Sequence, residues 1–153
     1  MKDLRVSTAE RLREAEEFFY AKIPLTRAMQ VRVESYNENE LVLTAPLRAN
    51  HNHLGTAFGG SLAALVMLAG YALLWLELGD RNAHIMISES NLRFRRPVQG
   101  TLRAICRRPD DPAISEFKSN FAAKGKARIQ LKVEIGAEHE LAAIFDGTYV
   151  AKK

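Results

Sequence analysis

A long apolar segment dominates the hydropathy pattern of the chain. No charged residue occurs between Ala57 and Leu76. A helix on a protein surface shows one polar face, so this segment predicts a helix that is buried on all sides. A segment of this length also fits a membrane span. We favour the buried helix, because the flanking segments alternate like half-buried strands of a soluble sheet and would lack a partner if the helix entered a bilayer.

Polar and apolar residues alternate over six further segments, which predicts six strands. These strands are expected at residues 29–34, 41–45, 85–96, 100–108, 126–135 and 141–150, with turns at 37–39 and 138–140. An N-terminal helix is expected from the capping-box spacing of Ser7 and Glu10. It should stop near Pro24, because the residue before a proline avoids helical geometry. Residues 113–124 fit either a short helical turn or an excursion of the sheet.

The order of these elements, α-β-β-α-β-β-β-β, predicts an α+β fold. The short connections between strands favour an antiparallel sheet, and such a sheet can bury the uncharged helix only by curling around it. We expect a single domain over residues 1–153, with an N-terminal helix over 1–23 and the core over 24–151.

Composition and charge narrow the class of protein. With 47% hydrophobic and 26% charged residues among 153, the chain is typical of a globular domain. The net charge is +4, but the basic residues alternate within strands and form no continuous tract, which argues against a nucleic-acid partner. The single cysteine, Cys106, excludes an internal disulfide framework. The N-terminal sequence lacks signal-peptide features, so we expect a cytoplasmic location.

The segment before the apolar helix carries the candidate chemistry. Residues 50–53 read Asn-His-Asn-His, and Gly59 and Gly60 follow where the helix should begin. Glycines let a ligand or another backbone approach closely, and the free N–H groups of a first helical turn favour negative charge. Tight packing of the helix against the sheet is the alternative reason for the glycine pair, and the two reasons are compatible.

Four short motifs occur in a characteristic order. They read NHLGTAFGG at 52–60, NLRFRRPVQG at 91–100, GKAR at 125–128 and FDGTYV at 145–150. Together they resemble the hotdog fold of acyl-thioester enzymes, in which a curved antiparallel sheet wraps around one long helix. In particular the chain resembles the thioesterase-like family known as the YiiD C-terminal domain, over residues 24–151.

The resemblance implies an assembly and a substrate class. It implies a homodimer, or a dimer of such dimers, with active sites at the subunit interface. The implied substrates are thioesters of coenzyme A or of an acyl carrier protein, with the acyl chain in a tunnel and the pantetheine arm near its mouth. It implies hydrolysis without a metal or a bound cofactor. From the charge pattern and the buried helix we expect no nucleic-acid or membrane partner.

The loop departs from the pattern Asn-x-x-Gly-x-x-His-Gly-Gly that many hotdog enzymes carry. Asn52 and Gly55 match this pattern, but Phe58 stands at the histidine position. Several of these enzymes also carry a carboxylate nine residues further along, where this chain has Met67. Their catalytic scheme therefore does not transfer unchanged.

Thioester hydrolysis needs a polarised carbonyl and an activated water. The backbone N–H groups of Gly59 and Gly60 are candidates for polarising the carbonyl. Four side chains are candidates for activating the water: Asn52, His53, Glu89 and Ser90. Our hypothesis is that Glu89 is the base or orients the water, with Asn52 and His53 helping from the loop, because the resemblance takes its strand past the partner's loop. A solvated surface position is the alternative for Glu89.

Other residues are candidates for holding the substrate. Arginine and lysine suit the phosphates of coenzyme A or the acidic face of a carrier protein. The basic candidates are Arg93, Arg95, Arg96, Lys126 and Arg128, although a solvated strand edge explains each of them as well. We expect acyl-chain contacts from Leu62, Leu65 and Met67 of the helix, which core packing explains equally well.

Two other functions compete with hydrolysis. Hydration or dehydration of an acyl thioester fits the fold, but the chain lacks a helix carboxylate paired with a loop histidine. A non-catalytic module that binds acyl thioesters, or regulates through them, is favoured by Phe58 and Met67. If thioester turnover survives Glu89→Ala undiminished, the assignment of Glu89 as the base is wrong.

Overall fold

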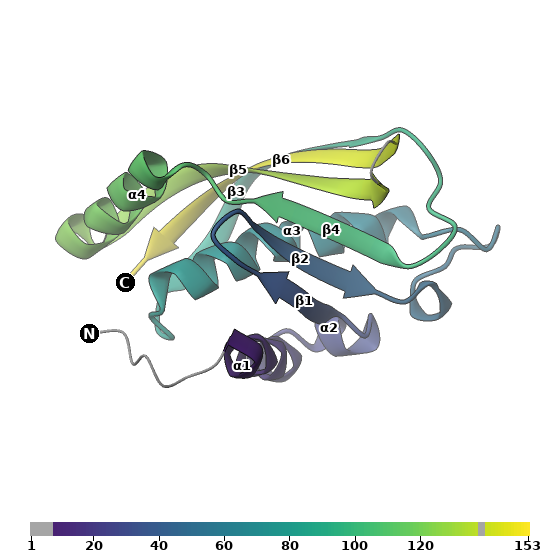
Figure 1. Ribbon diagram of the computed structural model, residues 1–153, viewed down its shortest axis with the longest axis horizontal. Coiled ribbons are helices and arrows are strands. Elements are labelled where there is room, and N and C mark those ends of the chain that lie inside the picture. Colours follow the sequence, from purple (N-terminus) through teal and green to yellow (C-terminus); the bar gives the residue numbers. More distant parts are fainter. Residues whose placement is uncertain (1–7, 138–139) are drawn as a thin grey trace.

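The computed structural model describes residues 8–137 and 140–153. Its elements are α1 (Thr8–Lys22), α2 (Pro24–Ala28), β1 (Arg32–Tyr36), β2 (Glu40–Ala45), the short 3-10 helix η1 (Leu47–Ala49), α3 (Gly59–Leu78), β3 (His84–Phe94), β4 (Leu102–Arg107), α4 (Asp111–Lys124), β5 (Lys126–Ala137) and β6 (Glu140–Lys152). Figure 1 shows one curved sheet with α3 running behind it, α1 and α2 beside β1, and α4 at the N-terminal end of β5.

The sheet has six antiparallel strands in the order β1-β2-β4-β5-β6-β3. This confirms the α+β fold expected from the sequence, a curved antiparallel sheet around a central helix. Of the described strands, β3 pairs with β6 alone, so it forms one edge of the sheet. Most of its 11 residues are exposed.

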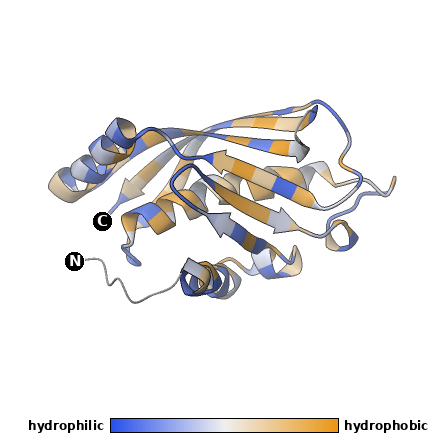
Figure 2. Ribbon diagram, viewed as in Figure 1, coloured by the Kyte–Doolittle hydropathy of each residue, from blue (hydrophilic) through white to orange (hydrophobic). Residues whose placement is uncertain are grey.

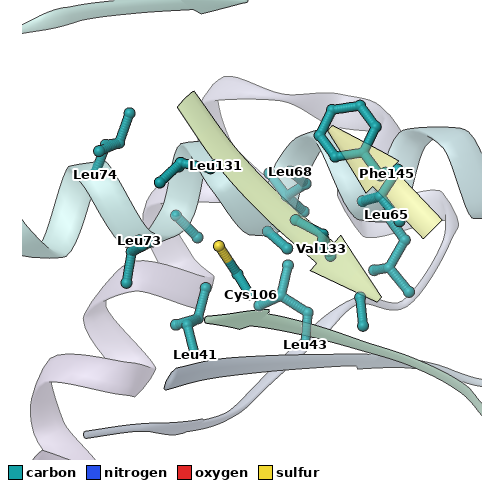
Figure 3. Packing of buried hydrophobic residues seen from close by; sticks show 14 of the residues in the cluster. Leu41, Leu43, Leu65, Leu68, Leu73, Leu74, Cys106, Leu131, Val133 and Phe145 are labelled. Carbon is teal, nitrogen blue, oxygen red and sulfur yellow. The ribbon is translucent and has the colours of Figure 1, made fainter. Parts of the chain in front are cut away.

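Helix α3 is the centre of the hydrophobic core. It begins after Phe58, whose backbone is extended, and ends at Gly79. The φ of Gly79 is 65°, a left-handed conformation that glycine adopts more readily than other residues. The helix is long and apolar enough to cross a membrane, but 61% of its most apolar window is buried inside the protein. The strands over α3 show alternating apolar and polar bands (Figure 2), and Figure 3 shows leucines of α3 packed against residues of β2, β4, β5 and β6. The expectation of a core helix is therefore confirmed, but α3 is not buried on all sides, because Ala64, Met67 and Tyr71 are only partly buried.

One close approach fixes how α3 lies on β6. The Tyr149 ring occupies the space where any side chain at Gly70 would stand, so a Cβ there would overlap the ring. The Tyr149 hydroxyl donates a hydrogen bond to the Met67 carbonyl at 2.7 Å. Glycine at position 70 thus lets β6 contact the middle of the helix.

Two helices differ from the sequence-based expectation. Residues 24–28 form the short helix α2 with Pro24 at its start, so the first strand begins at Arg32 and not near residue 29. The segment that fitted either a helical turn or a sheet excursion is the 14-residue helix α4. Asp110 caps it by accepting the Ala113 N–H at 2.9 Å, and Gly125 ends it. The expected capping box at Ser7 and most of the turn at 138–140 lie outside the described residues.

A buried ion-pair cluster ties the C-terminal end of α3 to its neighbours. The Glu77 side chain, 4% exposed, accepts hydrogen bonds from Tyr36 at 2.6 Å and Arg108 at 2.5 Å, and pairs with Lys118 at 2.9 Å. Burial by itself raises the pKa of the Glu77 carboxyl, but these three partners outweigh it and lower the pKa to about 2. The cluster connects α3 with β1, with α4 and with the segment after β4.

The single cysteine lies in the core. Cys106 of β4 is fully buried beneath α3 (Figure 3). Burial raises the pKa of its thiol to about 12. The expected role as a small apolar strand residue agrees with this position.

Candidate functional site

The loop before α3 is held closed by a buried asparagine. Asn50, 2% exposed, donates from Nδ2 to the Met29 and Pro46 carbonyls, both at 2.9 Å. Its own carbonyl accepts the N–H of Phe58 at 2.7 Å. These bonds join the beginning of the loop to the start of α3. The Oδ1 atom of Asn50 is buried without a hydrogen-bond partner. It could therefore accept a hydrogen bond from a water or a ligand.

Asn52 organises the tip of the loop. Its Oδ1 accepts the N–H groups of Leu54 at 2.9 Å and Thr56 at 3.2 Å, and its Nδ2 donates to the Thr56 hydroxyl at 2.9 Å. This is the pattern of an Asx turn, which stabilises a tight bend. Both ends of the Asn52 amide are therefore engaged inside the loop.

The two loop histidines are exposed. His51 bridges to Ala57 through its backbone, and its Nδ1 lies 3.0 Å from the Asn52 carbonyl. His53 lies at the tip beside Leu54, which is 73% exposed. The loop projects beyond the N-terminal end of α3 (Figure 1), so His53 is placed to meet another molecule.

The first turn of α3 lies between two exposed aromatic rings. The N-cap residue Phe58 offers no side-chain cap, so the first N–H groups of α3 stay available. A Cβ on Gly60 would overlap the Phe58 ring, whereas a Cβ on Gly59 would lie 3.8 Å from the Phe94 ring. Phe58 and Phe94 are 55% and 56% exposed. The N-terminus of α3, which favours negative charge, is thus bordered by apolar surface.

A bulge at Ser88 interrupts β3 between Ile87 and Glu89. Ile87 lies opposite Tyr149, but the register then slips, and Glu89 lies opposite Thr148 and Ser90 opposite Gly147. Because side chains alternate across a sheet, Ser90 shares the α3 face with Ile87, and Glu89 points to the outer face. There Glu89 borders a polar hollow of about 680 Å³. Within one chain, the structure does not bring Glu89 together with the loop.

The five basic candidates fall into two separate groups. Arg93 lies opposite Ile144 near one end of β3, and Arg95 and Arg96 follow it. Lys126 lies opposite Lys152, which in turn lies opposite His84 at the other end of β3, with Arg128 nearby. Nine residues of strand span roughly 30 Å. A single basic patch, as expected from the sequence, therefore does not form within one chain.

An apolar groove of about 310 Å³ runs between α2, α3 and β3. Helix α3 contributes one stripe to it, namely Ala64, Met67, Leu68 and Tyr71. Of the three expected acyl-chain contacts, Met67 lines this groove. Leu62 and Leu65 instead lie in the core, 4% and 0% exposed, so the alternative of core packing holds for these two.

Sequence reasoning missed Asn50 and Tyr71. Asn50 stood inside the polar loop, but it lies outside the motif that singled out Asn52. Only the backbone contacts of the folded loop show that it is buried. Tyr71 stood in the uncharged helix, and its position seven residues after Ala64 was the available signal, since residues i, i+4 and i+7 share a helix face.

Comparisons with known proteins agree with this architecture. The model of the family described as "Putative thioesterase (yiiD_Cterm)" matches residues 12–153. A solved protein of unknown function from Chlorobaculum tepidum is 32% identical, with 96% of this chain and 97% of that chain covered and a TM-score of 0.88. A "putative thioesterase" from Shewanella oneidensis is 28% identical, with coverages of 95% and 99% and a TM-score of 0.81. A "probable thioesterase" from Pseudomonas aeruginosa is 27% identical, with coverages of 92% and 94% and a TM-score of 0.78.

Proposed function

The chain belongs to the yiiD C-terminal thioesterase family, and from this we propose that it hydrolyses an acyl thioester of coenzyme A or of an acyl carrier protein at a site between two subunits. Family membership and the two thioesterase relatives support hydrolysis as the reaction class. The observation that carries the proposal is the uncapped N-terminus of α3 beside the exposed edge strand β3.

The first turn of α3 suits the charge that develops in this reaction. Water attacks the thioester carbonyl carbon, and negative charge builds on the carbonyl oxygen. N–H groups of Gly59 and Gly60 would receive that oxygen, where the helix dipole adds to the stabilisation. The C–S bond then breaks, the thiolate leaves with a proton, and the carboxylic acid remains. Loss of one such donor typically lowers hydrolase rates by about 10²–10³.

Two of the candidate side chains fit a site on the α3 face. Ser90 lies on the α3 face of β3, four residues before Phe94, and its hydroxyl can hydrogen-bond to a water. His53 is an exposed imidazole on the projecting loop, and its ring nitrogens can donate or accept a hydrogen bond there. Glu89 would serve as the base only for a thioester bound at the outer face. In this proposal Asn52 keeps the loop in shape and does not contact the water.

We place the second subunit on β3. An exposed edge strand is a template for pairing with another chain, and β3 carries the exposed apolar residues Met86, Ile87 and Phe94. Antiparallel pairing of two β3 strands about a two-fold axis would bring the Arg93 end of one subunit to the His84 end of the other. The two basic groups would then meet across the interface as one patch for coenzyme A phosphates or an acidic carrier protein. The proposal includes no metal, bound cofactor, nucleic acid or membrane.

The test is release of free thiol from acyl-coenzyme A thioesters of increasing chain length, followed by acyl carrier protein thioesters. Turnover above the uncatalysed rate with any of them is the expected result. A folded protein that releases no thiol from either carrier would instead support a non-catalytic binding module. The engaged amide of Asn52 and the apolar Met67 favour that second candidate.

A further inference from the structure

We propose that the apolar groove between α2, α3 and β3 binds the acyl chain, and that it selects unbranched chains of about ten to twelve carbons with Tyr71 at the far end. The inference rests on the proposed thioester hydrolysis and adds the substrate class to it. It follows from the direction of the groove, its length and volume, and its lining.

The groove leads away from the N-terminus of α3. Gly59 lies beside the Phe94 ring, and Met67 is hydrogen-bonded to Tyr149, which lies opposite Ile87. Helix α3 therefore runs antiparallel to β3, from the Phe94 end toward the His84 end. The groove starts at Ala64, about one turn beyond the glycine pair, and follows this direction. A thioester carbonyl at the first turn of α3 would direct its chain into the groove.

The length of the groove sets a limit on the chain. Eleven residues separate Gly60 from Tyr71, which corresponds to about 16 Å along a helix. A carbon chain with bonds of about 1.5 Å and tetrahedral angles advances about 1.25 Å per bond. This distance therefore takes roughly 13 bonds, or about 14 carbons counted from the carbonyl, which is an upper limit on the chain. The volume of about 310 Å³ equals that of about ten water molecules. Because a methylene group is similar in size to a water molecule, volume and length agree on a medium chain.

The lining fits a neutral hydrocarbon. None of the residues that line the groove is charged. The Thr26 and Tyr149 hydroxyls donate to the Ile23 and Met67 carbonyls at 2.8 and 2.7 Å, so both are engaged within the chain. Burial raises the pKa of the Tyr71 phenol, which keeps it uncharged. A carboxylate or another charged acyl group would lose its hydration here without gaining a partner.

The experiment measures binding apart from hydrolysis. Coenzyme A thioethers with S-alkyl chains of 2, 6, 10, 12 and 16 carbons cannot be hydrolysed, and calorimetry gives their affinities for the full chain. Each buried methylene should tighten binding by up to about fourfold, and the gain should stop beyond about 12 carbons. Because Ala64 lies where the groove starts, about 6 Å along the helix from Gly60, Ala64→Leu should cut this limit to about six carbons. Ala63→Leu, next to it on the helix but outside the groove lining, is the matched control and should leave the limit unchanged.

Tyr71→Ala should move the limit to longer chains, and Ala64→Leu keeps the test decisive if the Tyr71 variant does not fold. Affinity that does not depend on chain length, or no binding at any length, would overturn the inference. Equal shifts of the chain-length limit in Ala64→Leu and Ala63→Leu would also overturn the inference. So would an Ala64→Leu variant that changes only subunit association, because the groove would then hold the partner's loop and not the acyl chain. Chain-dependent binding without hydrolysis of the matching thioesters would refute the proposed function and leave the groove assignment standing.

Discussion

Gly59 and Gly60 are equivalent in sequence but differ in their surroundings. Only Gly60 lies directly under the Phe58 ring, while Gly59 has room for a methyl group. The two explanations considered from the sequence therefore separate: close packing explains Gly60, and it does not explain Gly59. Since Phe58 is exposed, its ring can move aside, and a larger residue at 60 should affect the site more than the fold.

Alanine substitutions at the two positions test this difference. Gly60→Ala should displace the Phe58 ring and lower kcat/KM for a thioester on the order of 10- to 100-fold, as small misplacements at active sites do. Gly59→Ala should retain activity within a few-fold. Both variants should unfold at or above the wild-type temperature, because alanine is the better helix former. Equal losses in the two variants would contradict a specific role for the Phe58 ring.

The position of Glu89 shows a limit of sequence reasoning at this scale. Strict alternation from Ile85 and Ile87 would put Glu89 on the α3 face, beside the loop. The bulge before Glu89 adds one residue to β3 and inverts that parity. A bulge depends on how β3 pairs with β6 some 60 residues later, so the local pattern does not reveal it. The position of the loop before α3 was predicted correctly, because glycines and asparagines act locally.

At the scale of elements, strong local signals predicted most of the structure. The uncharged run gave α3, Gly79 marked its end, and alternation gave the six strands. Helix α4 also had local signals, Asp110 as a cap and Ile114, Phe117 and Phe121 on one face, but the flanking prolines obscured them. Helix α2 had almost none, because five residues beginning with Pro24 are too few for a periodic pattern.

The Glu77 cluster joins several of these elements and should make stability depend on pH. The pKa of the Glu77 carboxyl is lowered from 4.5 to about 2. A lowered pKa in the folded state stabilises the protein above the unfolded value, and this stabilisation is lost as pH falls from about 4.5 toward 2. By linkage the effect is about 3 kcal/mol at neutral pH.

Urea unfolding of the wild type and of Glu77→Gln at several pH values measures the contribution of the Glu77 carboxylate to the free energy of unfolding. The variant should be less stable by about that amount at pH 7, and the difference should shrink below pH 4.5. Glu116→Gln, an exposed position on α4, serves as the control and should show little difference at any pH. A constant difference between wild type and Glu77→Gln would show that the carboxylate charge is not what stabilises the cluster.

At the scale of the whole molecule, the exposed edge strand β3 carries the proposed association of two copies. Met86 is 47% exposed on its outer face. Met86→Lys places a charge on the pairing edge, a device that natural edge strands use against association. We expect the mass in solution, measured by light scattering, to fall from that of a dimer to that of a monomer, with loss of thioester turnover.

Ile144→Lys is the matched control for that variant. Ile144 is half-buried on the same outer face of the sheet, but it belongs to the interior strand β6. It should remain a dimer. A monomeric wild type, or a monomer that turns over thioesters at the full rate, would contradict a site shared between subunits.

Cys106 has a practical consequence for labelling chemistry. It is the one thiol in the chain, it is fully buried, and burial raises its pKa to about 12, so the native protein should resist maleimides and similar electrophiles. A cysteine introduced on the surface, for example at Met86 or Leu54, would then carry a fluorophore or spin label alone. Spectroscopic distances between such labels could follow the loop and the β3 edge in solution without first replacing a native residue.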